Sequence, residues 1–200
     1  MDQFSNNKNP VKRIPNRLIM ENHTLLLILD MQEKLITNIQ ENKLIIFNIK
    51  KLIDTCNLLN VPVAITEQNP LKLGKTLEKI SDNKEYPSFQ KMEFSCYKSE
   101  GFFDYIKKYN FENIIICGIE SHICVLQSSI ELLEAGINIY IPKDAIGSRN
   151  KVDHEIAFLR LISSGAIAST TESIICELCK TAKRKEFKEI SKIIKTSFPN

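Results

Sequence analysis

Three residues have a type and a setting suited to covalent chemistry, namely Asp30, Lys91 and Cys124. Asp30 follows a run of five apolar residues, and Cys124 follows a short connection at the expected start of a helix. Helix amide groups and a nearby lysine lower the pKa of a thiol, so this setting predicts a Cys124 thiolate that attacks a carbonyl carbon. Asp30 and Lys91 supply charges at positions where a purely structural sequence has no need of them.

Each of these residues also has a structural interpretation. A cysteine at a helix start is commonly a buried packing residue, Asp30 can cap a helix entered at Met31, and Lys91 can be a solvated surface lysine. His122 can shuttle a proton, but we favour a role in holding its loop or lining a subunit contact. Cys176 and Cys179 form a Cys-x-x-Cys without a second ligand pair, which favours packing thiols over a zinc or redox site.

The surrounding sequence alternates between buried strands and amphipathic helices. Continuous apolar runs predict strands, and apolar residues at helical spacing predict the helices between them. This alternation predicts an α/β fold, a three-layer Rossmann-like parallel sheet of about six strands with helices on both faces. The expected strands cover 25–29, 61–65, 114–117, 137–141 and 166–168, and the expected helices cover 43–59, 102–108, 125–135, 152–164 and a segment from about Ser173.

The carboxyl ends of the predicted strands bring the reactive residues together. Asp30 ends the first strand, Thr66-Glu67-Gln68 ends the second, and Gly118-Ile119-Glu120 precedes the helix of Cys124. Ligands of parallel sheets bind beyond the carboxyl ends of the strands, where the topology reverses. We therefore expect the active site at this edge.

Length and composition predict one domain. A chain of 200 residues with 43% hydrophobic content can bury one core, which we place at 22–196 behind a flexible polar N-terminal arm at 1–21. The 27 basic and 24 acidic side chains are evenly scattered, which argues against nucleic acid or a membrane as a partner. No glycine-rich phosphate loop occurs, so no cofactor is predicted. Several of the six cysteines lie inside apolar segments, which predicts reduced thiols and a cytoplasmic protein, with a mitochondrial location as the alternative.

Several separate stretches together resemble the isochorismatase-like superfamily of cysteine hydrolases, over roughly residues 22 to 196. Within that superfamily they look most like the isochorismatase domain-containing proteins. The stretches are Leu29-Asp30-Met31-Gln32, Thr66-Glu67-Gln68-Asn69-Pro70, Leu73-Gly74-Lys75-Thr76, Lys91-Met92-Glu93-Phe94-Ser95, Gly118 to Val125, and Asp144-Ala145-Ile146-Gly147-Ser148-Arg149.

The resemblance implies a role for each site residue. Asp30 would be the general base, Lys91 would orient it and lower the thiol pKa, and Cys124 would attack. A cis peptide between Ile119 and Glu120 would let the backbone amides of Glu120 and Cys124 form an oxyanion hole. The substrate pocket is expected at Gln32, Glu67, Gln68, Phe94 and Ser121.

Departures from relatives narrow the expected chemistry. Metal-dependent nicotinamidases carry histidines after the second strand, whereas this chain has none between His23 and His122, so no metal is predicted. Isochorismatases proper act on a vinyl ether without the cysteine nucleophile, so Cys124 favours acyl transfer to water. The resemblance and apolar side chains in the C-terminal segment also suggest a homo-oligomer. These side chains can cover a neighbouring copy or the chain's own core, and they are Phe187, Ile190, Ile193 and Ile194.

The leading hypothesis is a hydrolase of a small amide or related carbonyl compound. A second hypothesis is a binding or assembly module that has lost its catalytic power. A third hypothesis is a ribonuclease, but the sequence shows no basic stripe or aromatic platform that would support RNA binding.

Overall fold

The computed structural model describes residues 18–81 and 84–199. Most of the predicted N-terminal arm, residues 1–17, lies outside the described part. Ile19, near the end of the predicted arm, is buried, and its backbone N–H donates a hydrogen bond to the Glu177 carboxylate over 2.8 Å. Arg184 donates to Glu21 over 2.7 Å. Ile19 and Glu21 therefore contact the C-terminal part of the chain, although both fall within the segment that we expected to be an arm.

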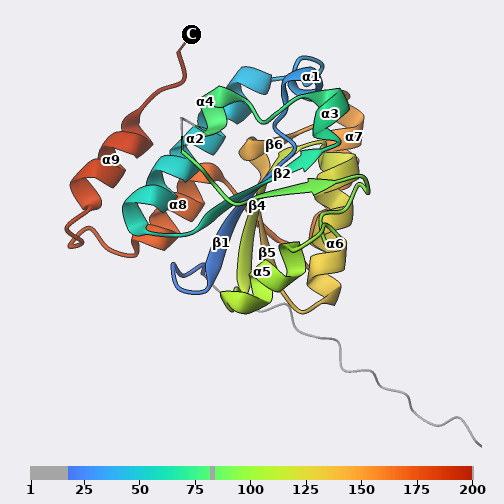
Figure 1. Ribbon diagram of the computed structural model, residues 1–200. Helices are drawn as coiled ribbons and strands as arrows, with labels where there is room; N and C mark the ends of the chain where they lie inside the picture. The colour runs from blue at the N-terminus through green and yellow to red at the C-terminus, as the bar shows by residue number, and fades with distance from the viewer. Residues whose placement is uncertain (1–17, 82–83, 200) are drawn as a thin grey trace, which may run out of the picture.

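A parallel sheet forms the middle layer, with strand order β3-β2-β1-β4-β5-β7 and the short β6 paired to β4 (Figure 1). Every strand pair is parallel, which confirms the predicted α/β class. The strands are β1 (Thr24–Leu29), β2 (Val63–Gln68), β3 (Ser88–Lys91), β4 (Asn113–Ile119), β5 (Asn138–Pro142), β6 (Ile146–Gly147) and β7 (Ile167–Ser169).

Helices cover both faces of the sheet. On one face α2 and α8 pack over alternate side chains of β1 and β4, such as Leu26 and Ile115, and α9 packs against α2 and α8. On the other face α5, α6 and α7 pack over Leu27 and Ile116. All six residues of β1 are buried, because this central strand is covered on both sides. The helices are α1 (Glu33–Ile36), α2 (Asn42–Leu59), α3 (Pro70–Leu73), α4 (Glu78–Ser81), α5 (Phe102–Lys108), α6 (Leu126–Glu134), α7 (Lys151–Ser163), α8 (Thr171–Cys179) and α9 (Phe187–Lys195).

Two strands were not predicted from the sequence. β3 is an edge strand with one sheet neighbour, and in its four residues only Phe89 is apolar, so it lacks the continuous apolar run of a buried strand. β6 is only two residues long. The predicted second strand at 61–65 lies two to three residues too early, because the paired segment continues through the polar Thr66, Glu67 and Gln68.

Gly118 fixes how closely β4 approaches β1 next to the expected site. Gly118 pairs with Leu29, and its φ of +114° lies in the region that favours glycine. A Cβ at this position would lie 2.1 Å from the Leu29 carbonyl oxygen, so any side chain would force the strands apart. The glycine thus holds the turn that follows β4 against the residue before Asp30.

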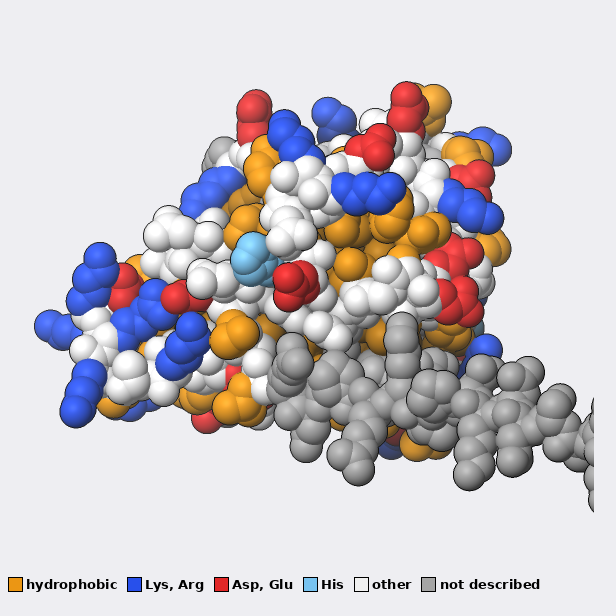
Figure 2. Space-filling model, turned by 90° about the horizontal axis from the view of Figure 1, so that it is seen from below, with side chains coloured by type: hydrophobic (Ala, Val, Ile, Leu, Met, Phe, Trp, Pro, Cys, Tyr) orange, Lys and Arg blue, Asp and Glu red, His pale blue; other side chains and the backbone are white. Residues whose placement is uncertain are grey.

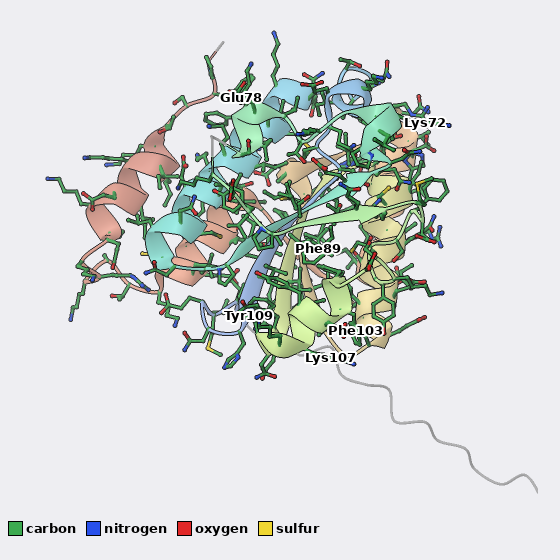
Figure 3. All side chains as sticks on the ribbon, viewed as in Figure 1. Lys72, Glu78, Phe89, Phe103, Lys107 and Tyr109 are labelled. Carbon is green, nitrogen blue, oxygen red and sulfur yellow. The ribbon has the colours of Figure 1, made fainter. Side chains whose placement is uncertain are left out.

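Charged side chains and aromatic rings are unevenly spread over the folded chain. Aromatic rings gather around α5 at the edge of the sheet, including Phe89, Phe103 and Tyr109 (Figure 3). Lys107 Nζ lies 4.4 Å from the centre of the Phe103 ring. Basic side chains gather at the left end of the face in Figure 2, where α9 lies in Figure 1. These rings come from residues separated in sequence; Phe102 and Phe111 are buried, and Tyr109 is 50% exposed.

The six cysteines are free thiols, and Cys176 is the exposed one. Cys176 and Cys179 lie on α8, as expected for a helical Cys-x-x-Cys. None of the helices among residues 18–81 and 84–199 is long and apolar enough to cross a membrane.

Candidate active site

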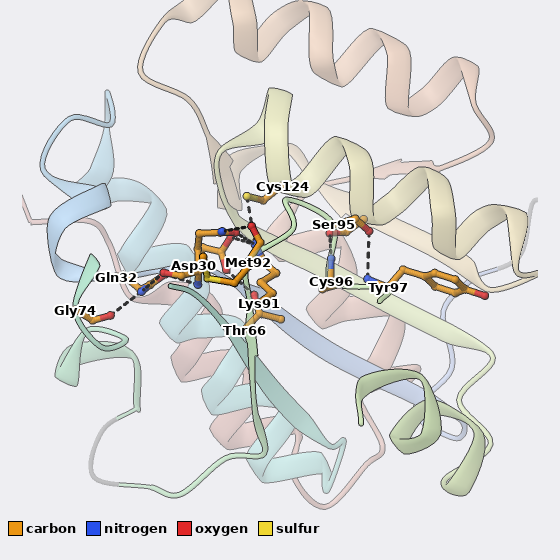
Figure 4. Close-up of polar contacts among 12 residues, drawn as sticks. Asp30, Gln32, Thr66, Gly74, Lys91, Met92, Ser95, Cys96, Tyr97 and Cys124 are labelled. Atoms are coloured by element: carbon orange, nitrogen blue, oxygen red, sulfur yellow. Dashed lines mark hydrogen bonds and ion pairs between the residues drawn. The ribbon is translucent and has the colours of Figure 1, made fainter. Parts of the chain in front are cut away.

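Asp30, Lys91 and Cys124 meet beyond the carboxyl ends of β1, β3 and β4 (Figure 4). Lys91 Nζ donates to Asp30 Oδ2 over 2.6 Å and lies 3.4 Å from Cys124 Sγ. The side chains of Asp30 and Lys91 are fully buried, and Cys124 is 7% exposed. One ammonium group therefore contacts both the carboxylate and the thiol in a setting that excludes most water.

Asp30 has an unusual backbone conformation, and both of its carboxylate oxygens accept hydrogen bonds. Its φ is +52°, an uncommon conformation for a residue other than glycine. The Thr66 hydroxyl donates to Asp30 Oδ1 over 2.7 Å, while Lys91 occupies Oδ2. This carboxylate is therefore fixed in place before any substrate arrives.

Lys91 is positioned by the register between β2 and β3. Gln68 lies opposite Lys91 in this pairing, and its Oε1 accepts a hydrogen bond from Lys91 Nζ over 2.7 Å. The same Gln68 side chain donates through Nε2 to the Met92 carbonyl over 2.8 Å. Gln68 therefore helps to orient the Lys91 ammonium group.

The thiol of Cys124 is not the resting thiolate that the sequence predicted. Burial raises its pKa to about 12; the Asp30 charge also raises it, and Lys91 lowers it only in part. Cys124 lies in a π-helical turn (Ser121–Val125) that precedes α6. The prediction of a low pKa was wrong because burial and a neighbouring carboxylate outweigh the helix and the lysine.

The turn that carries Cys124 begins with a cis peptide between Ile119 and Glu120. Three side chains tie it to the segment after β5. Glu120 pairs with Arg149 over 3.0 Å, Ser121 Oγ lies 3.0 Å from His154 Nδ1, and His122 Nδ1 lies 3.0 Å from Ser148 Oγ. His122 therefore contacts loop residues, which agrees with the structural role favoured for it.

The residues expected to form the substrate pocket do not share one environment, because some are buried and one is exposed. Gln32 is fully buried, and its amide bonds the backbone of Gln68 and Gly74. Glu67 accepts from the backbone and hydroxyl of Thr76, and Ser121 is buried against His154. Phe94 is 53% exposed. A groove of about 360 Å³ reaches Lys91, and its other lining residues include Asn69, Leu71, Gln90, Met92 and Ser99.

Two hydrogen bonds that the sequence did not predict join the segment after Lys91 to helix α6, which follows the Cys124 turn. Ser95 Oγ donates to Glu131 over 2.6 Å, and the Cys96 backbone N–H donates to Ser128 Oγ over 2.9 Å. Glu131 and Ser128 lie on α6, directly after the Cys124 turn. The pairing depends on how α6 packs, which no local pattern in the sequence indicates.

Metal ligands are not grouped in the described part of the chain. Among residues 18–81 and 84–199, no three His, Cys, Asp or Glu side chains lie together in a way that could hold a metal ion. Asp30, the acidic residue of the trio, already contacts Lys91 and Thr66.

Comparisons with known proteins agree with this fold. The Isochorismatase domain family matches residues 24–173. Isochorismatase domain-containing protein 2 of Danio rerio is 34% identical over 88% of this chain and 89% of its own length. The solved structure of MAR1 ribonuclease from Caenorhabditis elegans is 36% identical, with a TM-score of 0.86 over 92% of this chain and 95% of that one.

A more distant structure shares the fold alone. The YcaC gene product of Escherichia coli, described as an octameric hydrolase of unknown specificity, is 21% identical. Its TM-score is 0.80 over 84% of this chain and 85% of that chain. The family match covers most of the sequence and the Danio rerio relative spans nearly all of it, so the chain belongs to the isochorismatase family, as a relative of the isochorismatase domain-containing proteins.

Proposed function

We propose that the chain is a metal-independent hydrolase in which Cys124 attacks the carbonyl carbon of a small amide or related compound. The observation that carries this proposal is the buried Lys91 ammonium, which contacts the Asp30 carboxylate at 2.6 Å and the Cys124 thiol at 3.4 Å. A base and a thiol held on one cation form the arrangement that activates a sulfur nucleophile.

The first half of the proposed reaction is acylation. Because the pKa of the Cys124 thiol is about 12, the thiol keeps its proton at rest and passes it to Asp30 as sulfur attacks. The sulfur–carbon bond forms and the carbonyl π electrons move to oxygen. The backbone amides of Glu120 and Cys124 are the proposed donors to this oxyanion, each contributing about 3 kcal/mol of barrier lowering. The amine then leaves with the proton from Asp30.

The second half is hydrolysis of the thioester. Asp30 removes a proton from water, the hydroxide attacks the carbonyl carbon, and the thiol leaves as sulfur regains the proton. Lys91 contacts both the Asp30 carboxylate and the Cys124 sulfur and so holds the two groups in position for proton transfer. Asp30 thus alternates between accepting and donating one proton, and the cycle consumes only substrate and water.

The proposal is tested by a substrate screen with a matched variant. Wild type is expected to hydrolyse at least one member of a panel of small amides and esters, and Cys124→Ala is expected to lose that turnover completely. A panel without any hit, together with no covalent labelling of Cys124 by acyl donors, would favour the second hypothesis, the binding or assembly module.

Ribonuclease activity is a second candidate, favoured by the MAR1 ribonuclease relative and by the aromatic rings and lysines around α5. Base stacking on exposed rings such as Tyr109, which is 50% exposed, is the way single strands bind without sequence preference. The same screen therefore includes a labelled single-stranded RNA. RNA cleavage that survives in Cys124→Ala would support this candidate over the cysteine hydrolase.

We further propose that the chain acts as a homo-oligomer. Two roles were expected for the apolar C-terminal side chains, covering a neighbour or covering the chain's own core, and Ile190, Ile193 and Ile194 have the second. The octameric state described for the YcaC protein supports self-association.

A further inference from the structure

The C-terminal part of the chain concentrates positive charge. Residues 180–195 include seven basic and two acidic side chains, a net charge of +5, whereas the whole chain carries +3. All other residues together therefore carry a net charge of −2. The count over the whole chain, which led us to expect no membrane partner, hides this concentration.

Three of these lysines form a stripe along the outer face of α9. Lys188, Lys192 and Lys195 are spaced by four and three residues, which places them on one side of the helix. Ile190 lies on the opposite side of α9 and is buried in the core. The three lysines are exposed, and α9 is the outermost helix at the left of Figure 1. The stripe therefore faces away from the rest of the molecule.

Contacts within the chain do not explain the stripe. Lysines three or four residues apart on a helix repel each other, so the stripe weakens α9. The helix dipole favours Lys192 and Lys195 in the last turn, but it disfavours Lys188 in the first turn. Within the described residues 18–81 and 84–199, the salt bridges of this segment involve other side chains than these three. Their charges are therefore available to a partner.

The acidic side chains nearby leave the stripe positively charged. Glu186 lies 2.9 Å from Arg184 and 3.5 Å from Lys185, and Glu21 lies 2.7 Å from the same Arg184. Glu189 is the acidic residue of α9 and flanks the stripe, so the helix keeps a net charge of +2. The helices α2 and α8, which pack against α9, add no net charge between them.

The form of this surface fits an anionic membrane. A convex helix presents its lysines to a flat surface, whereas single-stranded RNA binds in a basic groove with aromatic rings. Lysine is a compact hydrated charge suited to diffuse attraction, while recognition of individual phosphates favours arginine, and Arg184 is already paired. Phe187 begins α9 and Phe198 follows its end, and each is 37% exposed. Aromatic rings in such positions suit the headgroup region of a membrane.

We infer that the outer face of α9 docks onto an anionic membrane surface through Lys188, Lys192 and Lys195. The attraction is electrostatic, because the apolar face of α9 stays packed on the chain's own core. The inference does not depend on the chemistry proposed for Cys124.

Sedimentation of the full chain with lipid vesicles tests the inference. At low salt the chain is expected to bind vesicles that contain phosphatidylserine, but not vesicles of phosphatidylcholine alone. Replacing all three stripe lysines with glutamine should weaken binding about a hundredfold, at about fivefold for each lysine. Circular dichroism checks that the fold is kept.

A matched control removes the same amount of charge elsewhere. It combines three substitutions of exposed lysines outside α9, namely Lys72→Gln, Lys75→Gln and Lys108→Gln. Because these charges lie away from the proposed contact, binding should change by no more than about threefold. A loss as large as that of the stripe variant would show that net charge alone, and not α9, sets the affinity.

The other outcomes also decide between partners. A wild-type chain that does not bind phosphatidylserine vesicles at low salt would overturn the inference, and so would equal binding to both kinds of vesicle. Unchanged binding by the stripe variant would overturn the assignment to α9. Binding of a labelled single-stranded RNA through the same lysines, without binding to vesicles, would make a nucleic acid the partner instead.

Discussion

Asp30→Asn is expected to slow turnover strongly while making Cys124 react faster with alkylating reagents. At pH 8 a thiol with a pKa of about 12 is ionised in roughly one protein in ten thousand. The substitution removes the negative charge that raises this pKa, exchanges the carboxylate for a neutral amide, and leaves Lys91, which lowers the pKa. The thiol pKa should therefore fall, so alkylation at pH 8 should accelerate. Turnover should fall by about 10² to 10⁴, because the group that carries the proton is lost.

The measurement is the rate of iodoacetamide labelling of the Cys124 peptide between pH 6 and 10, followed by mass spectrometry. Peptide analysis separates Cys124 from the exposed Cys176. Asp104→Asn on the outer face of α5 is the matched control and should change neither labelling nor turnover. Wild-type labelling rates in Asp30→Asn at every pH would show that Asp30 does not set the thiol pKa.

Lys91→Met is expected to lower the free energy of unfolding by about 3 to 5 kcal/mol and to remove activity. Both members of the Lys91–Asp30 pair are fully buried, so deleting the cation leaves an uncompensated carboxylate in the interior. The pKa of Cys124 should also rise further, because Lys91 is the group that lowers it. The two effects have one cause, the loss of the shared ammonium.

Chemical denaturation measures the stability effect, with Lys72→Met as control because Lys72 is exposed on α3. Adding Asp30→Asn to Lys91→Met should recover part of the stability, since it removes the unpaired charge, but should not recover activity. Equal unfolding free energies for Lys91→Met and Lys72→Met would contradict a buried, energetically coupled pair.

The parts of the fold that the sequence predicted are those with a strong local signal. β1 is a continuous apolar run, so both its burial and the position of Asp30 at its end could be predicted. Helix α5 was predicted with its observed bounds, because it begins after Gly101 and carries apolar residues at helical spacing. In contrast, β3 was not predicted, because it is defined by its pairing with β2 and not by a local apolar run. This pairing places Lys91 opposite Gln68.

The parts of the site that were missed depend on packing rather than on pattern. Gln32 and Glu67 looked like pocket residues, but their polar atoms bond the loop that follows β2. The Ser95–Glu131 contact joins segments 36 residues apart. The thiol pKa was misjudged because a sequence shows that Lys91 and Cys124 can meet, but not how deeply both are buried.

The most direct test of the proposed mechanism is the mass of the protein during turnover of an acyl donor such as p-nitrophenyl acetate. After an acid quench, wild type is predicted to carry one acetyl group on the Cys124 peptide, and the group should disappear as substrate is exhausted. Cys124→Ala is predicted to carry none and to release no p-nitrophenol above the uncatalysed rate. Steady release of p-nitrophenol at the wild-type rate by Cys124→Ala would contradict nucleophilic catalysis by Cys124.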